Sequence, residues 1–442
     1  MRSLLVLILV YGSVPLALAI PHVGVLVWSW VSYMSPHRLT WGIAYSAPLL
    51  DALAGATLIG WLISKEPKKI TWHPIIVLLA IYVAWYTIAT IFAYNQAEAW
   101  PRWTETMKIQ LFTFVSLGLM LSKNRMHALL WVIVISLGFF GMKGGLFTAL
   151  SGGSQHVWGP PGSFIADNNQ LALALVMTLP MMRYLQMNAP VKWISWALVG
   201  AMGLTILSIF GSQSRGALLA LGCMMAFMIL KSRQRGLMIL FALFALAVGV
   251  SFMPDSWRNR MSTIESYEQD SSAMGRLAVW EFAWYVALER PLVGGGPDVF
   301  IHKPTVDRMR PKLVPNYVTR APHSIWFEVL GASGFVGLFL FIAIGCTAFF
   351  SARRLEKRIG DRADLKWARD LAMMFQVSLV GYAVNGTFLN LSRFDLYYHF
   401  LVIYVIAHTL ASRQLGTATK KVKILPRAAP TTPPAPTSPP VL

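Results

Sequence analysis

Long apolar runs, separated by short polar connections, make up most of the chain. A helix needs roughly 20 apolar residues to cross a bilayer, so each long run predicts a membrane-spanning helix. We predict twelve spans, over residues 3–20, 45–63, 74–93, 108–121, 126–149, 169–182, 193–211, 217–230, 236–253, 323–350, 371–390 and 397–412. Residues 21–44 are interrupted by Pro21, Pro36, Arg38 and Gly42, and we predict an outer or re-entrant segment there instead of a crossing.

Basic residues cluster in every second connection between these spans. The clusters are Lys65, Lys68 and Lys69; Lys123 and Arg125; Arg183 and Lys192; Lys231, Arg233 and Arg235; Arg353, Arg354, Lys357, Arg358 and Arg362; and Lys420, Lys421 and Lys423. The positive-inside rule predicts that these connections and both termini are cytoplasmic. The start of the chain, with Arg2, an apolar run and Ala17-Leu18-Ala19, also fits a cleaved signal peptide, and this alternative stays open.

Composition narrows the class of protein. Of the 442 residues, 56% are hydrophobic and 13% charged, with a mean hydropathy of +0.55, which excludes a soluble enzyme with a small anchor. Two cysteines exclude a disulfide-built fold. We therefore predict an all-α polytopic integral membrane protein. It divides into residues 1–253 (spans one to nine), 254–322 (a large outer loop), 323–412 (spans ten to twelve) and 413–442 (a Pro-rich, disordered cytoplasmic tail).

The loop over residues 254–322 is much longer than a connection needs to be, and long loops are usually functional. Within it, Met274 to Arg290 reads as a helix that is stopped by Pro291 and the three glycines from 294 to 296. One face of this helix carries Leu277, Trp280, Trp284 and Leu288. Such a helix can lie along the membrane surface or pack on the bundle, and the pattern alone favours neither.

Arg215 is the cation whose position is hardest to explain as surface charge. It follows Ser212, Gln213 and Ser214 in a turn between two apolar runs that is too short to carry a guanidinium far from the bundle. A guanidinium offers planar, bidentate hydrogen bonds that match phosphate oxygens, and Gln213, Ser214 and nearby amides can complete an anion site. The alternatives are an arginine that snorkels to lipid headgroups, and a turn that merely ends two helices.

His323 follows Pro322 where the tenth predicted span begins. The positive end of a helix dipole favours neutral imidazole, which can accept a proton, so His323 is a candidate general base. A capping or interfacial histidine is the alternative. Glu328, about one turn further along, is placed to orient the ring or to bind a loop cation.

Missing motifs also guide the interpretation. The chain contains no H-E-x-x-H, D-x-D, P-loop or G-x-S-x-G motif, so metal-dependent hydrolysis, ATP hydrolysis and a serine esterase lack support. We expect chemistry with no metal, no cofactor and no nucleic-acid partner. Cations beside a candidate base, at the outer end of a bundle that faces lipid, suit a substrate with an apolar tail and a phosphorylated head.

At these positions the sequence resembles the O-antigen ligase and polymerase superfamily of bacterial inner-membrane glycosyltransferases. The matching residues, in the family's order, are Gly162-Ser163-Phe164, Asn168-Asn169, Ser214-Arg215-Gly216, Gly275-Arg276 with Trp280, Pro291 with Gly294 and Gly296, and His323-Ser324 followed by Gly331 and Gly334. The stretch from Trp28 to Tyr45 resembles a subset of O-glycosylation ligases associated with exosortase systems.

The resemblance implies inverting, metal-independent transfer of a glycan from undecaprenyl pyrophosphate to a hydroxyl of the lipid A-core at the periplasmic face of the inner membrane. It also implies that Arg215 and Arg276 hold the pyrophosphate, with Gln213 and Ser214 beside them, and that His323 activates or positions the acceptor. O-antigen polymerase and protein O-glycosylation ligase are alternatives with the same site. A lipid or solute transporter is an alternative of another class, although the charges lie near span ends and not at the midplane.

Overall fold

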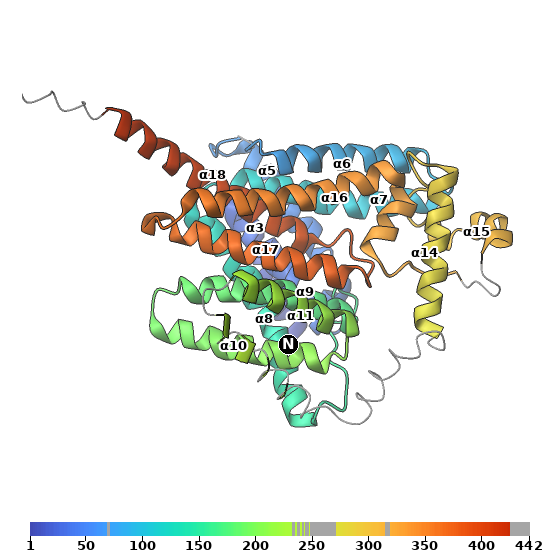
Figure 1. Cartoon of the computed structure of the whole chain (residues 1–442), viewed down its shortest axis with the longest axis horizontal. Coiled ribbons are helices and arrows are strands. Elements are labelled where there is room, and N and C mark those ends of the chain that lie inside the picture. Colours follow the sequence, from blue (N-terminus) through green and yellow to red (C-terminus); the bar gives the residue numbers. More distant parts are fainter. Residues whose placement is uncertain are drawn as a thin grey trace, which may run out of the picture.

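The computed structural model describes residues 1–68, 71–231, 271–313 and 319–424, with a few isolated positions between 235 and 247. The regular elements in these residues are helices. Figure 1 shows that the long helices run side by side as a bundle, with α14 crossing one end of it and α18 extending beyond the other. The described part of the chain is therefore all-helical, as the apolar runs predicted.

The helices follow the chain in this order. They are α1 (Arg2–Gly12), α2 (Val14–Ala19), α3 (Pro21–Met34), α4 (Ile43–Ser46), α5 (Leu49–Ile63), α6 (Pro74–Ile91), α7 (Gln96–Leu119), α8 (Lys123–Ser151), α9 (Asn168–Met187), α10 (Lys192–Gly211), α11 (Arg215–Lys231), α14 (Ser271–Glu289), α15 (Lys303–Met309), α16 (Ile325–Ile359), α17 (Lys366–Gly386) and α18 (Asp395–Ile424), with 3-10 helices η1 (Pro36–Leu39), η3 (Val299–Ile301), η4 (Arg310–Lys312) and η5 (Ala363–Leu365).

Most predicted spans coincide with a helix. In the part of the chain that the structure describes, five helical segments are long and apolar enough to cross a membrane, which identifies a multi-pass membrane protein. The ninth predicted span, 236–253, lies almost wholly outside the described residues, so the count of twelve stays a prediction. Helix α18 continues to Ile424, past the predicted start of the tail at 413, and residues 425–442 lie outside the described part.

Our prediction for residues 21–44 was wrong. These residues contain α3, a helix packed against α2, α5 and α8, whose Gly24 lies against Thr57 of α5. Pro21 does not interrupt this helix, because it occupies the first turn, where a proline needs no hydrogen-bond donor. The segment therefore runs back through the bundle instead of staying at its surface.

Ion pairs and ring contacts gather the predicted basic connections at one end of the bundle, here called the basic end. Arg125 pairs with Glu66 (2.7 Å), Lys231 pairs with Glu356 (2.6 Å), and Lys123 lies over the ring of Trp367 (4.7 Å). The alternation of charge along the sequence thus identified loops that share one side.

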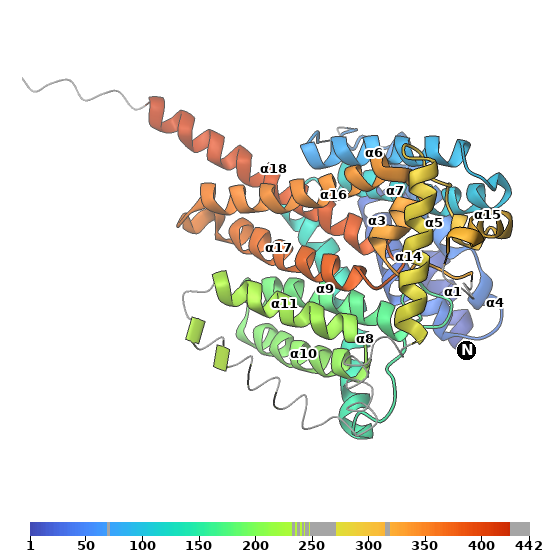
Figure 2. The same ribbon diagram turned by 45° about the vertical axis from the view of Figure 1, so that its right-hand side comes forward.

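The N-terminus was predicted on that same side, and the structure contradicts this. The turn into α3 lies at the basic end, where His22 approaches Glu66 (3.7 Å). Ser3 lies at the other end of the α1–α2 segment, where its hydroxyl accepts a hydrogen bond from the Ala44 N–H (3.2 Å). Figure 2 shows α1 and α4 toward the end that carries α14 and α15. The additional helix α3 changes the side on which the chain starts.

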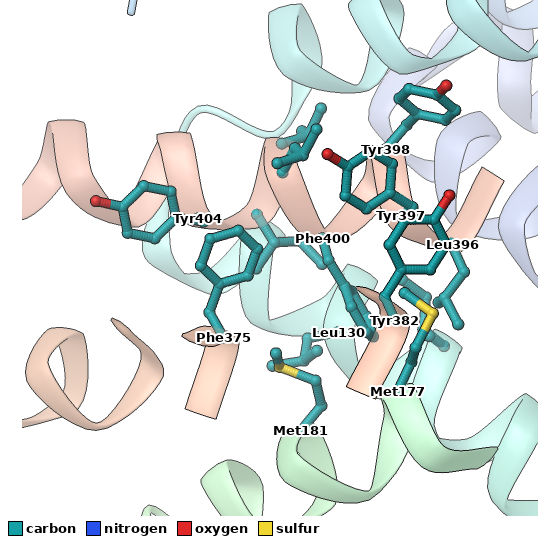
Figure 3. Close-up of a cluster of buried hydrophobic side chains, with 14 of the residues drawn as sticks. Leu130, Met177, Met181, Phe375, Tyr382, Leu396, Tyr397, Tyr398, Phe400 and Tyr404 are labelled. Atoms are coloured by element: carbon teal, nitrogen blue, oxygen red, sulfur yellow. The ribbon is translucent and has the colours of Figure 1, made fainter. Parts of the chain in front are cut away.

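The centre of the bundle is an aromatic and methionine core formed by α8, α9, α17 and α18. Figure 3 shows Phe375 beside Tyr404 and Tyr382 beside Tyr397, and both pairs are stacked, with ring centroids 4.6 Å and 4.4 Å apart. Met181 of α9 is buried in the same cluster. Stacked rings and flexible methionines fill this space closely, which holds these helices in fixed positions.

Helix α16 is broken at Gly334, where φ is +68° and ψ is −170°. The loop that follows α14 fits against this break. The Gly295 and Gly296 N–H groups donate to the Gly331 and Ala332 carbonyl oxygens (2.8 and 3.1 Å), and the Phe335 N–H donates to the Pro291 carbonyl oxygen (2.8 Å). These bonds occupy the backbone groups that the break releases from the helix.

The predicted helix of the long loop is present as α14. Two alternatives were left open for it, packing on the bundle and lying along the membrane surface, and its two faces suit one each. One face packs in a small separate core with Val279, Phe282, Val286 and residues of η3 and α15. Leu277, Trp284 and Leu288 are about half exposed (45%, 47% and 54%), on a helix that crosses the end of the bundle (Figure 1). That exposed apolar face suits contact with the membrane surface.

Candidate active site

The candidate residues lie where the starts of α9, α11 and α16 meet the end of α17, opposite the basic end. The Asn168 side chain at the start of α9 donates to the Ser212 carbonyl oxygen (2.7 Å). The Trp326 indole in the first turn of α16 donates to Thr387 Oγ1 after α17 (2.9 Å). These bonds draw together segments that are far apart in the sequence, and we call this region the site end.

Arg215 is the first residue of α11 and is partly buried. The turn before it is fixed by its own polar groups: Ser212 Oγ accepts from the Ser214 N–H (3.3 Å), and Ser214 Oγ accepts from the Ala217 N–H (3.4 Å). Gln213 has φ of +54°, and its amide donates to the Gly153 carbonyl oxygen (3.2 Å). Gln213 and Ser214 thus stabilise the turn that precedes Arg215. Pyrophosphate binding by these two residues stays a prediction.

A buried asparagine, which no sequence pattern indicated, lies against the same turn. A Cβ atom at Gly216 would lie 2.9 Å from Asn385 Oδ1, so glycine is needed for this close approach. Asn385 is fully buried at the end of α17, and neither of its side-chain amide atoms has a hydrogen-bond partner among the residues that the structure describes. The glycine after Arg215 therefore has a packing role at the site end.

His323 precedes α16 with a positive φ of 45°, and its side chain is accessible. Desolvation lowers the pKa of His323, and the positive charge of Arg276 lowers it further. The carboxylate of Asp167 opposes this shift, while Arg320 adds to it. Neutral imidazole, the form that can accept a proton, is therefore favoured at neutral pH.

Arg276, Asp167 and Arg320 thus lie close enough to His323 for their charges to act on it, and the roles of these residues in a site stay predictions. Asp167 caps α9 by accepting from the Asn169 N–H (2.9 Å), and its neighbour Asn168 binds the turn before Arg215. This short path connects the surroundings of His323 to the Arg215 turn. We expected Arg215 and His323 to meet in one water-accessible hollow at the outer end of the bundle. The structure has both residues at this end, and their meeting in one hollow stays a prediction.

Glycine at position 275 explains how two arginines fit side by side. A Cβ atom at Gly275 would lie 1.8 Å from Arg320 Nη2, so the glycine lets the Arg320 guanidinium lie against α14 next to Arg276, and a larger residue would displace it. The Gly275-Arg276 pair was noted in the sequence, but Arg320 was not selected. In the sequence, Arg320 is one of several cations of the long loop. Its position against α14 distinguishes it from the others, and this position is known only from the structure.

Trp280 fixes the segment that carries His323. Its indole N–H donates to the Pro322 carbonyl oxygen (2.7 Å), and its ring stacks on Phe327 (4.9 Å between centroids, 8° between planes). Trp280 was predicted on the same face as Leu277, Trp284 and Leu288. It is instead partly buried against the first turn of α16, so it positions the candidate base.

Glu328 takes the second of its two predicted roles. Its carboxylate approaches Arg393 Nε (3.7 Å) and accepts from the Ser392 N–H (3.1 Å). It thus joins the start of α16 to the loop between α17 and α18.

The described part of the chain is thus a helical bundle of a multi-pass membrane protein, with Arg215 and His323 at one end of it. Residues 200–342 match the family model described as O-antigen ligase, and residues 1–190 match a family of unknown function (DUF5935). No curated protein matches the chain. The chain therefore contains an O-antigen ligase family domain, which confirms the resemblance noted from its motifs. This family transfers lipid-linked glycans.

Proposed function

We propose that this protein is an O-antigen ligase of the bacterial inner membrane, with its site facing the periplasm. It transfers a glycan from undecaprenyl pyrophosphate to a hydroxyl of the lipid A-core, without a metal or a cofactor. The observation that carries this proposal is that the starts of α11 and α16, which carry Arg215 and lie next to His323, are drawn to one end of the bundle inside the residues that match the O-antigen ligase family.

The reaction needs two contributions from the protein. The acceptor oxygen attacks the anomeric carbon from the face opposite the pyrophosphate, the bond from that carbon to the pyrophosphate oxygen breaks, and the configuration inverts. Arg215 and Arg276 neutralise the charge that develops on the departing pyrophosphate. His323 takes the proton of the acceptor hydroxyl, a role that typically contributes about 10²- to 10⁴-fold in rate. A pyrophosphate leaves as a stabilised anion, so no general acid is required.

The substrate's anchor also fits the architecture. The site lies at the end of a bundle of apolar helices, so a polyprenyl tail can stay in the bilayer while its pyrophosphate reaches the arginines. The separate outer core around α14 lies over this end and carries Arg276. This arrangement supports entry of the donor sideways from the membrane.

The test is reconstitution of the purified protein with a lipid-linked glycan donor, with and without core-bearing lipid A. Ligase activity predicts a glycan attached to lipid A-core only when the acceptor is present. Chain growth with donor alone would identify a polymerase. Glycosylation of a Ser, Thr or Tyr hydroxyl on an added protein would identify a protein O-glycosylation ligase. Movement of lipid across proteoliposomes without any transfer would identify a transporter and overturn the proposal.

A further inference from the structure

A pocket of about 180 Å³ adjoins the segment that carries His323. Ala321 and Pro322, the two residues before His323, form part of its wall. Its remaining walls come from α6, α7, the loop around η3, the first turns of α16 and the loop between α17 and α18. The pocket is therefore a neighbour of the candidate base and is built from elements other than those that position Arg215.

The arginines and carboxylates that line this pocket are paired with one another. Arg102 pairs with Asp298 (2.7 Å), and Arg393 approaches Glu328 (3.7 Å). Glu105 forms ion pairs with both arginines, at 2.8 Å from Arg102 and 3.5 Å from Arg393. By contrast, the groups that act on His323 are two arginines and one aspartate, an excess of positive charge. The two neighbouring regions therefore suit ligands of different charge.

Uncharged groups complete the pocket. Tyr82 and Tyr86 contribute aromatic rings, and Asn390 contributes an amide whose Oδ1 atom is buried without a hydrogen-bond partner. Ile301, also in the wall, is 48% exposed, so the pocket has an opening to the surface. Carboxylates, guanidinium groups, an amide and aromatic rings in one hollow can bind the hydroxyls and the apolar faces of a sugar ring.

We propose that this pocket binds a neutral sugar ring of the acceptor and presents one of its hydroxyls to His323. The proposal rests on the proposed function, because it names the second substrate of the same site. A pyrophosphate is a poor fit here, since both arginines are already paired with carboxylates. The donor's own first sugar has the same chemistry, so the experiment must distinguish the two sources.

The experiment measures KM for donor and acceptor separately with the full-length protein in lipid nanodiscs. Asn390→Ala removes an amide without breaking a hydrogen bond of its Oδ1 atom, and we expect KM for the acceptor to rise about 3- to 10-fold. Arg393→Lys keeps the charge but cannot hold Glu105 and Glu328 in the same planar arrangement, and we expect a larger rise. In both variants, KM for the donor stays within about twofold of wild type.

The matched control is Arg310→Gln, which removes an exposed arginine of the same outer loop that pairs with Asp307 outside the pocket (2.8 Å). We expect both KM values to be unchanged in this variant. If Asn390→Ala raises KM for the donor alone, the pocket holds the donor sugar, and the proposal is overturned. Unchanged KM values for both substrates in Asn390→Ala would overturn it as well, even if Arg393→Lys fails to fold.

A binding measurement separates this inference from the proposed function. Deacylated core oligosaccharide is titrated into the wild type, Asn390→Ala and Arg310→Gln, and tryptophan fluorescence is followed. Saturable binding that is weakened only in Asn390→Ala supports a sugar pocket even if no transfer activity is found. Transfer activity without such a difference in binding would support the proposed function and contradict the pocket assignment.

Discussion

Replacing Gly334 with alanine tests how the break in α16 holds the site together. The φ and ψ of Gly334 (+68°, −170°) fall in a region that only glycine enters readily, and another residue there costs about 1–3 kcal/mol. The new Cβ atom would also lie 2.4 Å from the Leu292 carbonyl oxygen, which is backbone and cannot swing away. The loop must move, which weakens the bond from Phe335 N–H to the Pro291 carbonyl oxygen and its neighbours, each worth about 0.5–1.5 kcal/mol. We expect a total loss of about 3 kcal/mol in the stability of this region.

The assay has two readouts. Thermal unfolding in detergent, followed by fluorescence-detected size exclusion, should show a lower midpoint for Gly334→Ala, and transferase activity should fall at temperatures where the protein is still folded. Gly345→Ala is the matched control in the same helix, because its Cβ atom would have 3.7 Å to its nearest neighbour, the Tyr397 hydroxyl. If Gly334→Ala and Gly345→Ala have equal midpoints and equal activity, the break does not position the site, and this reasoning is wrong.

Four further predictions concern the chemistry. Arg215→Ala and Arg276→Ala should each abolish transfer while their size-exclusion profiles stay normal. Arg215→Lys should recover only part of the activity, because an ammonium lacks the bidentate geometry. Full activity in Arg215→Ala would remove that residue from the site. His323→Ala should lose about 10²- to 10⁴-fold in rate. Arg320→Gln removes a positive charge that lowers the pKa of His323, so the pKa of His323 should rise. The acidic limb of the pH profile of kcat/KM should then move to higher pH. If this limb does not move, His323 is not the base. EDTA treatment should leave the rate unchanged, and a loss restored by a divalent cation would contradict metal-independent transfer.

The sequence predicted most helices because apolar runs and their ends are local properties. It failed for α3 because Pro21, Pro36 and Gly42 were taken as interruptions, although each lies outside the interior of a helix: Pro21 starts α3, Pro36 starts η1, and Gly42 precedes α4. It placed the start of the fourth span at 108, whereas α7 begins at Gln96. The charged residues at the outer end of α7 have partners on other elements, and no single-sequence pattern shows those partners.

For the site, the sequence predicted the residues with unusual local surroundings and missed those selected by distant contacts. Arg215 and His323 stood out because each sits where an apolar run begins. Asp167, Arg320 and Asn385 did not, because their roles depend on contacts between α9, α14, α16 and α17. One feature of the sequence could have pointed to these partners: a glycine stands next to each candidate arginine. Gly216 follows Arg215 and lies against Asn385, and Gly275 precedes Arg276 and lies against Arg320.

The crosswise placement of α14 has a consequence for how bilayer composition controls the reaction. In the proposed ligase, the exposed Leu277, Trp284 and Leu288 would set the depth of this helix at the lipid–water boundary, and the same helix carries Arg276 and holds Pro322 through Trp280. The immersion of the helix would then set the height of Arg276 above the hydrocarbon. Turnover should then depend on acyl-chain length, because a thicker or thinner bilayer shifts the phosphates of the lipid substrate relative to a guanidinium that cannot follow them.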